Sequence, residues 1–328
     1  MVEYLFSKGV IKMYIFKLES VLKDYLWGGD RLLKKYGFKS DKEIAAEAWV
    51  LSCHKDGPST ISNGEFAGKE LRDVLTAEMM GENCKKFEKF PILTKLIDAK
   101  DNLSLQVHPS DETADKDAGE EGKTESWYIA DCDGGAELIY GFKADITKED
   151  FIESVNNGTF IDKVNRVKVK KGECYHIDAG TLHAICKGIF LVEVQQNSNT
   201  TFRVYDYDRV GADGKKRELH VDKALKVINY NKQEEVVFSG EENTENYSKR
   251  LLSECEFYNF SEVKTHCEYT GTADEKSFVS FVCIEGEGKI ECMENSVELI
   301  PGNCVFIPAE TGDFKITGKM TLLETRVP

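Results

Sequence analysis

The sequence lacks a membrane-spanning run, because no stretch of its 328 residues reaches about 18 consecutive apolar residues. The opening segment, MVEYLFSKGVIKMYIF, has no basic region followed by an apolar core and a small-residue cleavage site. Basic residues are also outnumbered, 43 against 58 acidic ones, which gives a net charge of −15. Nucleic acids and membranes recruit proteins through basic surfaces. We therefore expect neither as a partner, and we expect a cytoplasmic protein.

Paired cysteine motifs are absent as well. Ten cysteines are present, but none forms a CxxC pair and their spacing is irregular. Some lie inside apolar runs, such as Cys283 in SFVSFVCIEG. Scattered cysteines of this kind are typical of free, buried thiols in a reducing compartment. A zinc–thiolate site is not expected.

Short strand-like runs dominate what is present. They are separated by Gly and Asn turns. Helical patterns are confined to 64–90, to TKEDFIESV, which begins at Thr147 and has Asp150 at the capping-box position, and to 221–230. Such a pattern predicts a mostly β protein of sandwich or barrel type. Residues 232–249 are polar and acidic, which indicates a linker between strand-rich parts at 13–231 and 250–328. Residues 1–12 precede a second Met and are interpreted as a possible extension.

The two strand-rich parts share an internal repeat. KGECYHIDAGTLHAI, from Lys171, aligns with PGNCVFIPAETGDFKI, from Pro301, so that the Gly, Cys, Ile and Ala positions coincide. Chance similarity of two strand–turn–strand segments is the alternative. In this alignment His183 corresponds to Asp313, so the second copy has no histidine there. The repeat predicts the same barrel element twice, with metal-binding capacity in the first copy only.

Polar side chains alternate with apolar ones in LSLQVHPSDE, residues 103–112. Ser104, Gln106 and His108 would share one face of a strand, and Leu103, Leu105 and Val107 the other. A half-exposed strand explains this pattern equally well. In a jelly roll, however, the polar face would point inward, where Glu125 of GKTESWYI and His183 of TLHAI could join it. Imidazole, carboxylate and amide groups suit zinc, and also manganese, iron, cobalt or nickel.

The segment EVQQNSNTTFRVYDYDR, residues 193–209, is unusually polar for a pair of strands. An exposed hairpin is one explanation, since solvated polar groups carry no burial cost. The other is a binding site in which Arg203, whose guanidinium is planar and always charged, holds a phosphate.

Four blocks in order, LSLQVHP, GKTESWYI, AGTLHAI and QQNSNTTFRVYDYDR, resemble type I mannose-6-phosphate isomerases, which are cupin metalloenzymes. The resemblance extends from about Met13 to the end, and the helical insertion of longer members is missing. It implies two cupin-type jelly-roll barrels with a few peripheral helices, the first catalytic and the second degenerate. It also implies one bound Zn²⁺ and the interconversion of mannose 6-phosphate and fructose 6-phosphate, with a small sugar phosphate as the partner.

The resemblance further implies the roles of individual residues. The metal ligands would be Gln106, His108, Glu125 and His183. The substrate phosphate would meet Ser104, Lys95 and Arg203. Glu193 matches a pocket carboxylate, and Lys123 lies in KTE, where the family usually has KPE. The reaction moves a proton between C2 and C1 through an enediol, and Glu193 and Lys123 both stay open as its base.

Two other functions fit part of this pattern. An iron dioxygenase of the cupin class also uses two histidines and a carboxylate, but it has no need of Lys95, Ser104 and Arg203 together. A non-catalytic sugar-phosphate-binding protein could share the scaffold, although it could then dispense with the base.

Overall fold

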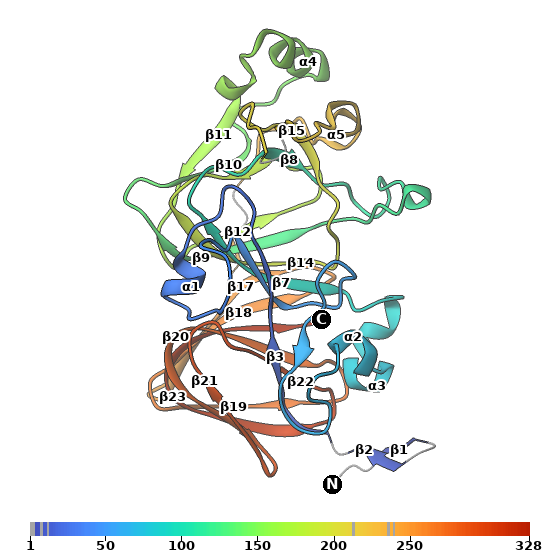
Figure 1. Cartoon of the computed structure of the whole chain (residues 1–328), viewed down its shortest axis with the longest axis vertical. Helices are drawn as coiled ribbons and strands as arrows, with labels where there is room; N and C mark the ends of the chain where they lie inside the picture. The colour runs from blue at the N-terminus through green and yellow to red at the C-terminus, as the bar shows by residue number, and fades with distance from the viewer. Residues whose placement is uncertain (1–3, 7–8, 12, 212–213, 235–236, 239) are drawn as a thin grey trace.

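The computed structural model describes residues 4–6, 9–11, 13–211, 214–234, 237–238 and 240–328. Two β units lie one above the other along the long axis (Figure 1). A separate hairpin, β1 (Tyr4–Phe6) with β2 (Gly9–Ile11), lies within the expected extension, of which residues 1–3, 7–8 and 12 fall outside the described residues. All ten cysteines are free. The expectation of a mostly β chain with free thiols is confirmed.

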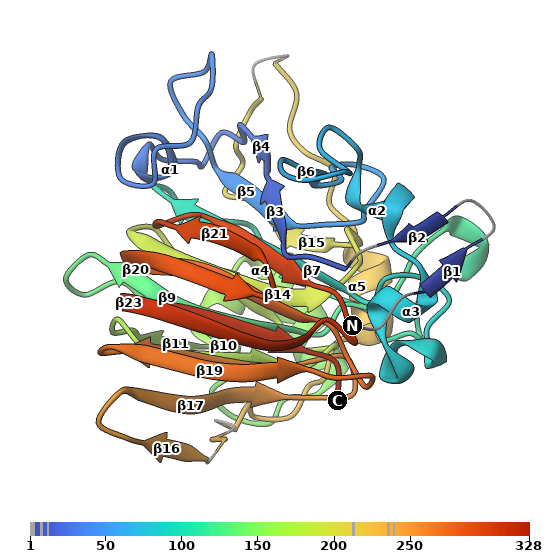
Figure 2. The same ribbon diagram turned by 90° about the horizontal axis from the view of Figure 1, so that it is seen from below.

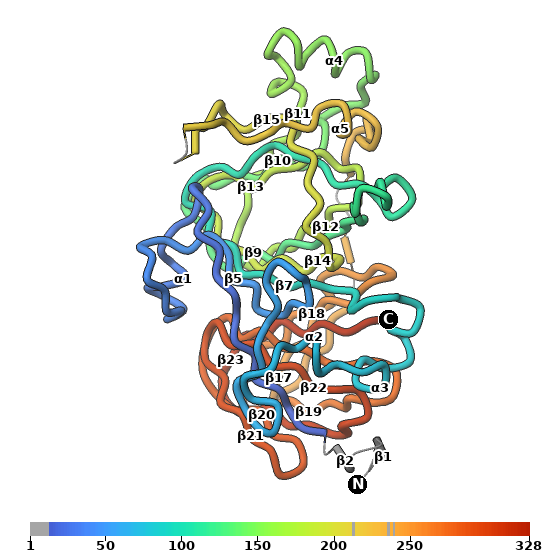
Figure 3. The backbone as a smooth tube through the Cα atoms, turned by 45° about the vertical axis from the view of Figure 1, so that its right-hand side comes forward, coloured from blue at the N-terminus to red at the C-terminus, as the bar shows by residue number. Residues whose placement is uncertain are grey.

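The first unit consists of two antiparallel sheets that curve around a common interior (Figure 3). The five-stranded sheet has the order β11 (Val164–Lys168), β10 (Glu137–Phe142), β13 (His183–Ile185), β8 (Leu105–Val107) and β15 (Phe202–Tyr205). The six-stranded sheet has the order β12 (Cys174–Ile177), β9 (Glu125–Cys132), β14 (Ile189–Gln196), β7 (Ile92–Ala99), β5 (Glu47–Leu51) and β4 (Val21–Lys23).

The six-stranded sheet is buried on both faces. In β14, Leu191 belongs to the core inside the first unit, whereas Phe190 and Val192 belong to the core shared with the second unit. Successive side chains of a strand point to opposite faces, so both sets must be apolar where both faces are covered. This explains the unbroken run IFLVEV, and it places Glu193 on the inward face with Leu191.

The second unit is a single ten-stranded sheet, and Figure 2 shows several of its strands lying side by side. Its main path is β16 (Glu241–Asn243), β17 (Tyr247–Glu254), β18 (Asn259–Thr265), β23 (Gly312–Arg326), β20 (Val279–Cys292), β22 (Cys304–Ile307), β3 (Phe16–Glu19) and β6 (Thr60–Ile61), with β19 (Glu268–Ala273) on β23 and β21 (Asn295–Leu299) on β20. The N-terminal strand β3 thus pairs with β22 near the other end of the chain. β16 and the start of β17 lie within the expected linker, and the domain boundaries stay a prediction.

Helices are few and peripheral. They are α1 (Arg31–Lys34), α2 (Leu71–Val74), α3 (Ala77–Met80), α4 (Lys148–Asn157) and α5 (Val221–Val227), with 3₁₀ turns η1 (Glu82–Lys86), η2 (Lys116–Ala118) and η3 (Phe160–Asp162). The capping box of Thr147 and Asp150 is confirmed at the start of α4. Phe151 of α4 and Ala224 of α5 pack on the outer side of the five-stranded sheet. Within the described residues no helix is both long enough and apolar enough to span a membrane.

The internal repeat has the same local structure in both copies. Gly172 and Gly302 both adopt φ of 89°, and each precedes a four-residue strand, β12 or β22. A positive φ of this size favours glycine, which accounts for its presence at both turns. His183 opens β13 and is buried, whereas Asp313 lies near the start of β23 and accepts a hydrogen bond from Thr272.

Candidate metal centre and active site

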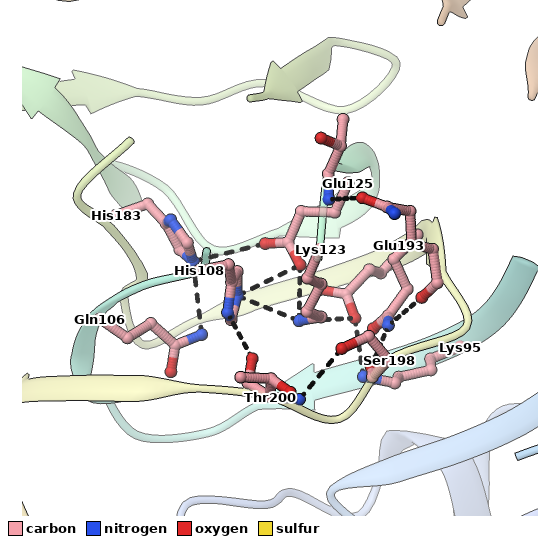
Figure 4. A network of polar contacts seen from close by, with 12 residues as sticks. Lys95, Gln106, His108, Lys123, Glu125, His183, Glu193, Ser198 and Thr200 are labelled. Atoms are coloured by element: carbon pink, nitrogen blue, oxygen red, sulfur yellow. Dashed lines mark hydrogen bonds and ion pairs between the residues drawn. The ribbon is translucent and has the colours of Figure 1, made fainter. Parts of the chain in front are cut away.

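Three potential metal ligands converge inside the first unit. His108 follows β8, Glu125 begins β9 and His183 begins β13, so both sheets contribute. One ligand atom from each residue lies within 4.8 Å of the others, and all three side chains are buried. Figure 4 shows them pointing toward one another. The barrel therefore brings together residues separated by up to 75 positions in the sequence.

The two imidazoles are held in one tautomer. Nδ1 of His108 lies 2.8 Å from the carbonyl of Thr200, and Nδ1 of His183 lies 2.8 Å from the carbonyl of Thr181. A carbonyl only accepts, so Nδ1 donates and Nε2 carries the lone pair. Nε2 faces Glu125 from both rings, at 3.5 and 3.4 Å. Burial lowers the pKa of both histidines, that of His183 to about 3, which favours the neutral, ligating form.

The carboxylate of Glu125 fits a site for a cation. Neither of its buried oxygens has a hydrogen bond of good geometry from a described residue, although Oε2 lies 2.6 Å from Nζ of Lys123. Burial, followed by the charge of Glu193, raises the pKa of Glu125. A divalent cation would offset both effects, because its charge stabilises the ionised carboxylate in place of the water that burial removes. Two neutral imidazoles and a carboxylate form a donor set that suits such an ion.

Gln106 lies at the edge of this cluster. Its Nε2 is 3.4 Å from Nε2 of His183, and its Oε1 accepts a hydrogen bond of 3.1 Å from Ser104. The amide oxygen is the ligating atom of glutamine, so ligation would require the amide to turn over. The inward direction predicted for Gln106 and His108 is confirmed. The prediction for Leu103 was wrong: it precedes β8 and lines the inner pocket, because the strand begins only at Leu105.

A pocket of about 160 Å³ adjoins the cluster. Six of the residues singled out in the sequence line it: Lys95, Ser104, Gln106, Lys123, Glu193 and Arg203. Nine further lining residues were not predicted: Tyr25, Trp27, Glu47, Ile97, Leu103, Ile185, Asn199, Thr201 and Arg217. Several of these come from the loop before α1, from β5 and from the segment before α5. Those segments carry no polar alternation that would have marked them.

Buried charges on one side of the pocket are paired. Nζ of Lys95 lies 2.9 Å from Oε1 of Glu193, and the indole of Trp127 donates to Oε2 of the same carboxylate at 2.9 Å. Burial opposes ionisation of Glu193, but Lys123 and Lys95 outweigh it and hold its pKa low. Lys123 also lies 3.1 Å from Nε2 of His108. The pocket thus combines an ionised carboxylate with two amines next to the candidate metal ligands.

Two arginines, Arg203 and Arg217, also line the pocket. Arg203 is partly buried on β15, and its Nε is buried without a hydrogen bond to any part of the chain that the structure describes. Burial and the nearby Arg217 lower the pKa of Arg203. Arg217 is fixed by Asp206, whose carboxylate accepts from its Nε at 2.7 Å. Two guanidinium groups that line one pocket, one of them with an unsatisfied Nε, form a suitable site for an anion such as phosphate.

We expect one metal ion per chain. Elemental analysis of the protein, dialysed after zinc loading, should give one equivalent, because the described residues contain a single His-containing cluster of potential ligands. Asp313→Ala should leave that value unchanged, since Asp313 bonds to Thr272 rather than to a ligand group. A second equivalent that is lost in Asp313→Ala would contradict this expectation.

Comparison with known proteins agrees with this arrangement. Residues 15–157 match the catalytic domain of type I phosphomannose isomerases, and residues 248–327 match the cupin domain of mannose-6-phosphate isomerases. The chain is 37% identical over 302 residues to mannose-6-phosphate isomerase ManA of Bacillus subtilis, covering 91% of this chain and 94% of that protein. The crystal structure of a mannose 6-phosphate isomerase from the same organism superposes with a TM-score of 0.89 at 35% identity, covering 95% of this chain and 99% of that one. The chain belongs to the type I phosphomannose isomerase family.

Proposed function

We propose that this protein interconverts mannose 6-phosphate and fructose 6-phosphate with one bound Zn²⁺. The observation that carries the proposal is a single pocket that adjoins the candidate metal cluster and is also lined by Arg203, whose buried Nε has no hydrogen bond from the described residues. A phosphorylated sugar has matching chemistry, with hydroxyl and carbonyl oxygens at one end and a dianion at the other. Membership of the family and the relatives named mannose-6-phosphate isomerase support the same substrate.

His108, Glu125 and His183 would hold the metal, with Gln106 as a fourth ligand. Bound zinc would act as a Lewis acid toward substrate oxygens. The carbonyls of Thr200 and Thr181 keep both imidazoles in the ligating tautomer, which is the usual role of such outer partners.

Arg203 would bind the phosphate, together with Ser104 and Arg217. The protein carries a net charge of −15, so its overall field repels a phosphate dianion and a local cationic site is needed. Lys95 lines the same pocket, but its ammonium is already paired with Glu193. We therefore assign Lys95 the role of holding Glu193 in place and ionised, rather than direct phosphate binding.

Lys123 and Glu193 are the two candidates for moving the proton between C2 and C1. Both line the pocket, and their charged atoms are 4.0 Å apart. The low pKa of Glu193 makes it a weak base, whereas an amine that has lost its proton is a stronger one. Holding the phosphate on Arg203 would keep the sugar carbons in register with these groups.

A coupled assay of fructose 6-phosphate formation from mannose 6-phosphate tests the proposal. We expect turnover that a chelator abolishes and added zinc restores. Binding of the sugar phosphate without turnover, with metal loaded, would indicate a sugar-phosphate-binding protein instead. Oxygen consumption by the iron-loaded protein, with no isomerisation, would indicate a dioxygenase. The shared presence of Ser104, Arg203 and Arg217 at the pocket argues against that second outcome.

A further inference from the structure

The orientation of His108 depends on a bend in the chain rather than on a strand. The carbonyl of Thr200, which accepts the Nδ1 proton of His108, lies in the segment 197–201 between the end of β14 and the start of β15. The backbone of a strand is fixed by hydrogen bonds to its neighbouring strands. Residues 197–201 belong to no strand in the described structure, so they lack such bonds on both sides. Other contacts must therefore place the Thr200 carbonyl.

Ser198 supplies one such contact. Its hydroxyl donates to the carbonyl of Glu121 at 3.1 Å and accepts from the backbone N–H of Thr200 at 3.2 Å. The N–H of Glu121 in turn donates to Oγ1 of Thr200 at 3.2 Å. The bend is thereby tied to the segment that leads into β9 and Glu125. Figure 4 shows Thr200 next to His108, with Ser198 on the other side of Thr200.

Gln195 supplies the strongest contacts. Its side-chain Nε2 donates to the carbonyls of Gln196 and Ser198 at 2.7 and 2.6 Å, and the residue is fully buried. Both partners are acceptors, so the amide orientation is unambiguous. Its Oε1 is left without a hydrogen bond from the described residues. A buried, half-satisfied amide has a free-energy cost, which its two donated hydrogen bonds must offset.

We infer that Gln195 is a positioning residue for the metal centre. By binding the carbonyls of Gln196, at the end of β14, and of Ser198, in the bend, with one amide, it sets the path on which the Thr200 carbonyl meets Nδ1 of His108. The bend connects Gln195 to His108, and Gln195 is also the cross-strand partner of the candidate ligand Glu125 in the ladder between β14 and β9. This inference rests on the metal role proposed above. The neighbouring Gln196 has different partners: its side chain accepts from the N–H of Thr124 and donates to the carboxylate of Asp111.

The test is Gln195→Met, which keeps length and burial and removes both donors. Competition of the metal-free protein with a chromogenic chelator should show Co²⁺ affinity reduced by about 10- to 100-fold, the usual effect of losing an outer partner of a metal ligand. The visible spectrum of the Co²⁺ form should also shift, because the His108 ring is less well oriented. Ser198→Ala acts on the same bend and should weaken Co²⁺ binding in the same direction.

Asn63→Leu provides a matched control. Asn63 also holds the backbone through its side-chain amide, donating to the carbonyl of Ile15 and accepting from the N–H of Lys17, but in the second unit. It should leave the Co²⁺ affinity and spectrum unchanged. Unchanged affinity in Gln195→Met, or an equal loss in Asn63→Leu, would overturn the inference. If Gln195→Met does not fold, unchanged affinity in Ser198→Ala would overturn it. Failure of the unmodified protein to bind Co²⁺ would instead contradict the proposed metal function.

Discussion

Replacing His108 or His183 with alanine is expected to remove the bound metal and to abolish isomerase activity. Each imidazole presents Nε2 toward Glu125. The cluster contains no third described histidine that could replace either of them. Loss of an outer partner of a metal ligand commonly costs 10- to 100-fold in affinity or activity, so loss of the ligand itself should exceed about 100-fold. Elemental analysis and the coupled assay measure the two effects in the same preparations.

A buried histidine outside the cluster is the control for this experiment. His176 bonds to Ser126, Ser253 and Asp178 where the two units meet. His176→Ala should lower stability and yet retain one equivalent of metal. A full equivalent of metal in His108→Ala or His183→Ala would remove that residue from the ligand set.

Arg203→Ala is expected to lower kcat/KM for mannose 6-phosphate by at least about 10- to 100-fold. That range corresponds to the loss of one charge-assisted contact of about 1.5–3 kcal/mol. The loss should be larger if the contact also aligns the sugar for proton transfer. Metal content should be unchanged, because Arg203 is not among the clustered ligands. Arg203→Lys keeps the charge without the planar fork, so it should recover only part of the activity.

Unphosphorylated mannose separates a phosphate role from a general one. The unmodified enzyme should strongly prefer the phosphorylated sugar, and Arg203→Ala should lose much of that preference. Arg166→Ala is a suitable control, since Arg166 lies on the edge strand β11 and forms an ion pair with Glu137 of the neighbouring strand β10. If Arg203→Ala kept the preference for mannose 6-phosphate over mannose, the phosphate would have to be assigned to Ser104 and Arg217 instead.

Local patterns in the sequence were sufficient for much of this picture. The alternation in LSLQVHP predicts which way Gln106 and His108 point, and the capping box at Thr147 predicts the start of α4. The glycine and apolar spacing around Gly172 and Gly302 predicts the repeated turn and strand. Such features depend on neighbours a few residues away, because side-chain direction and turn conformation follow local backbone geometry. The identity of the candidate ligands came from four such blocks in order.

Only the tertiary structure decided how these blocks meet. The closure of two sheets brings Glu125 of one within reach of His108 and His183 of the other, and it adds Arg217 to the pocket. Pairing of β3 with β22 joins residues up to 290 positions apart, as in the pair Phe16 and Phe306. The amide direction of Gln106 and the bend held by Gln195 also follow from packing. Long-range pairing is set by burial and hydrogen-bond satisfaction across the whole molecule, and a local sequence pattern does not contain that information.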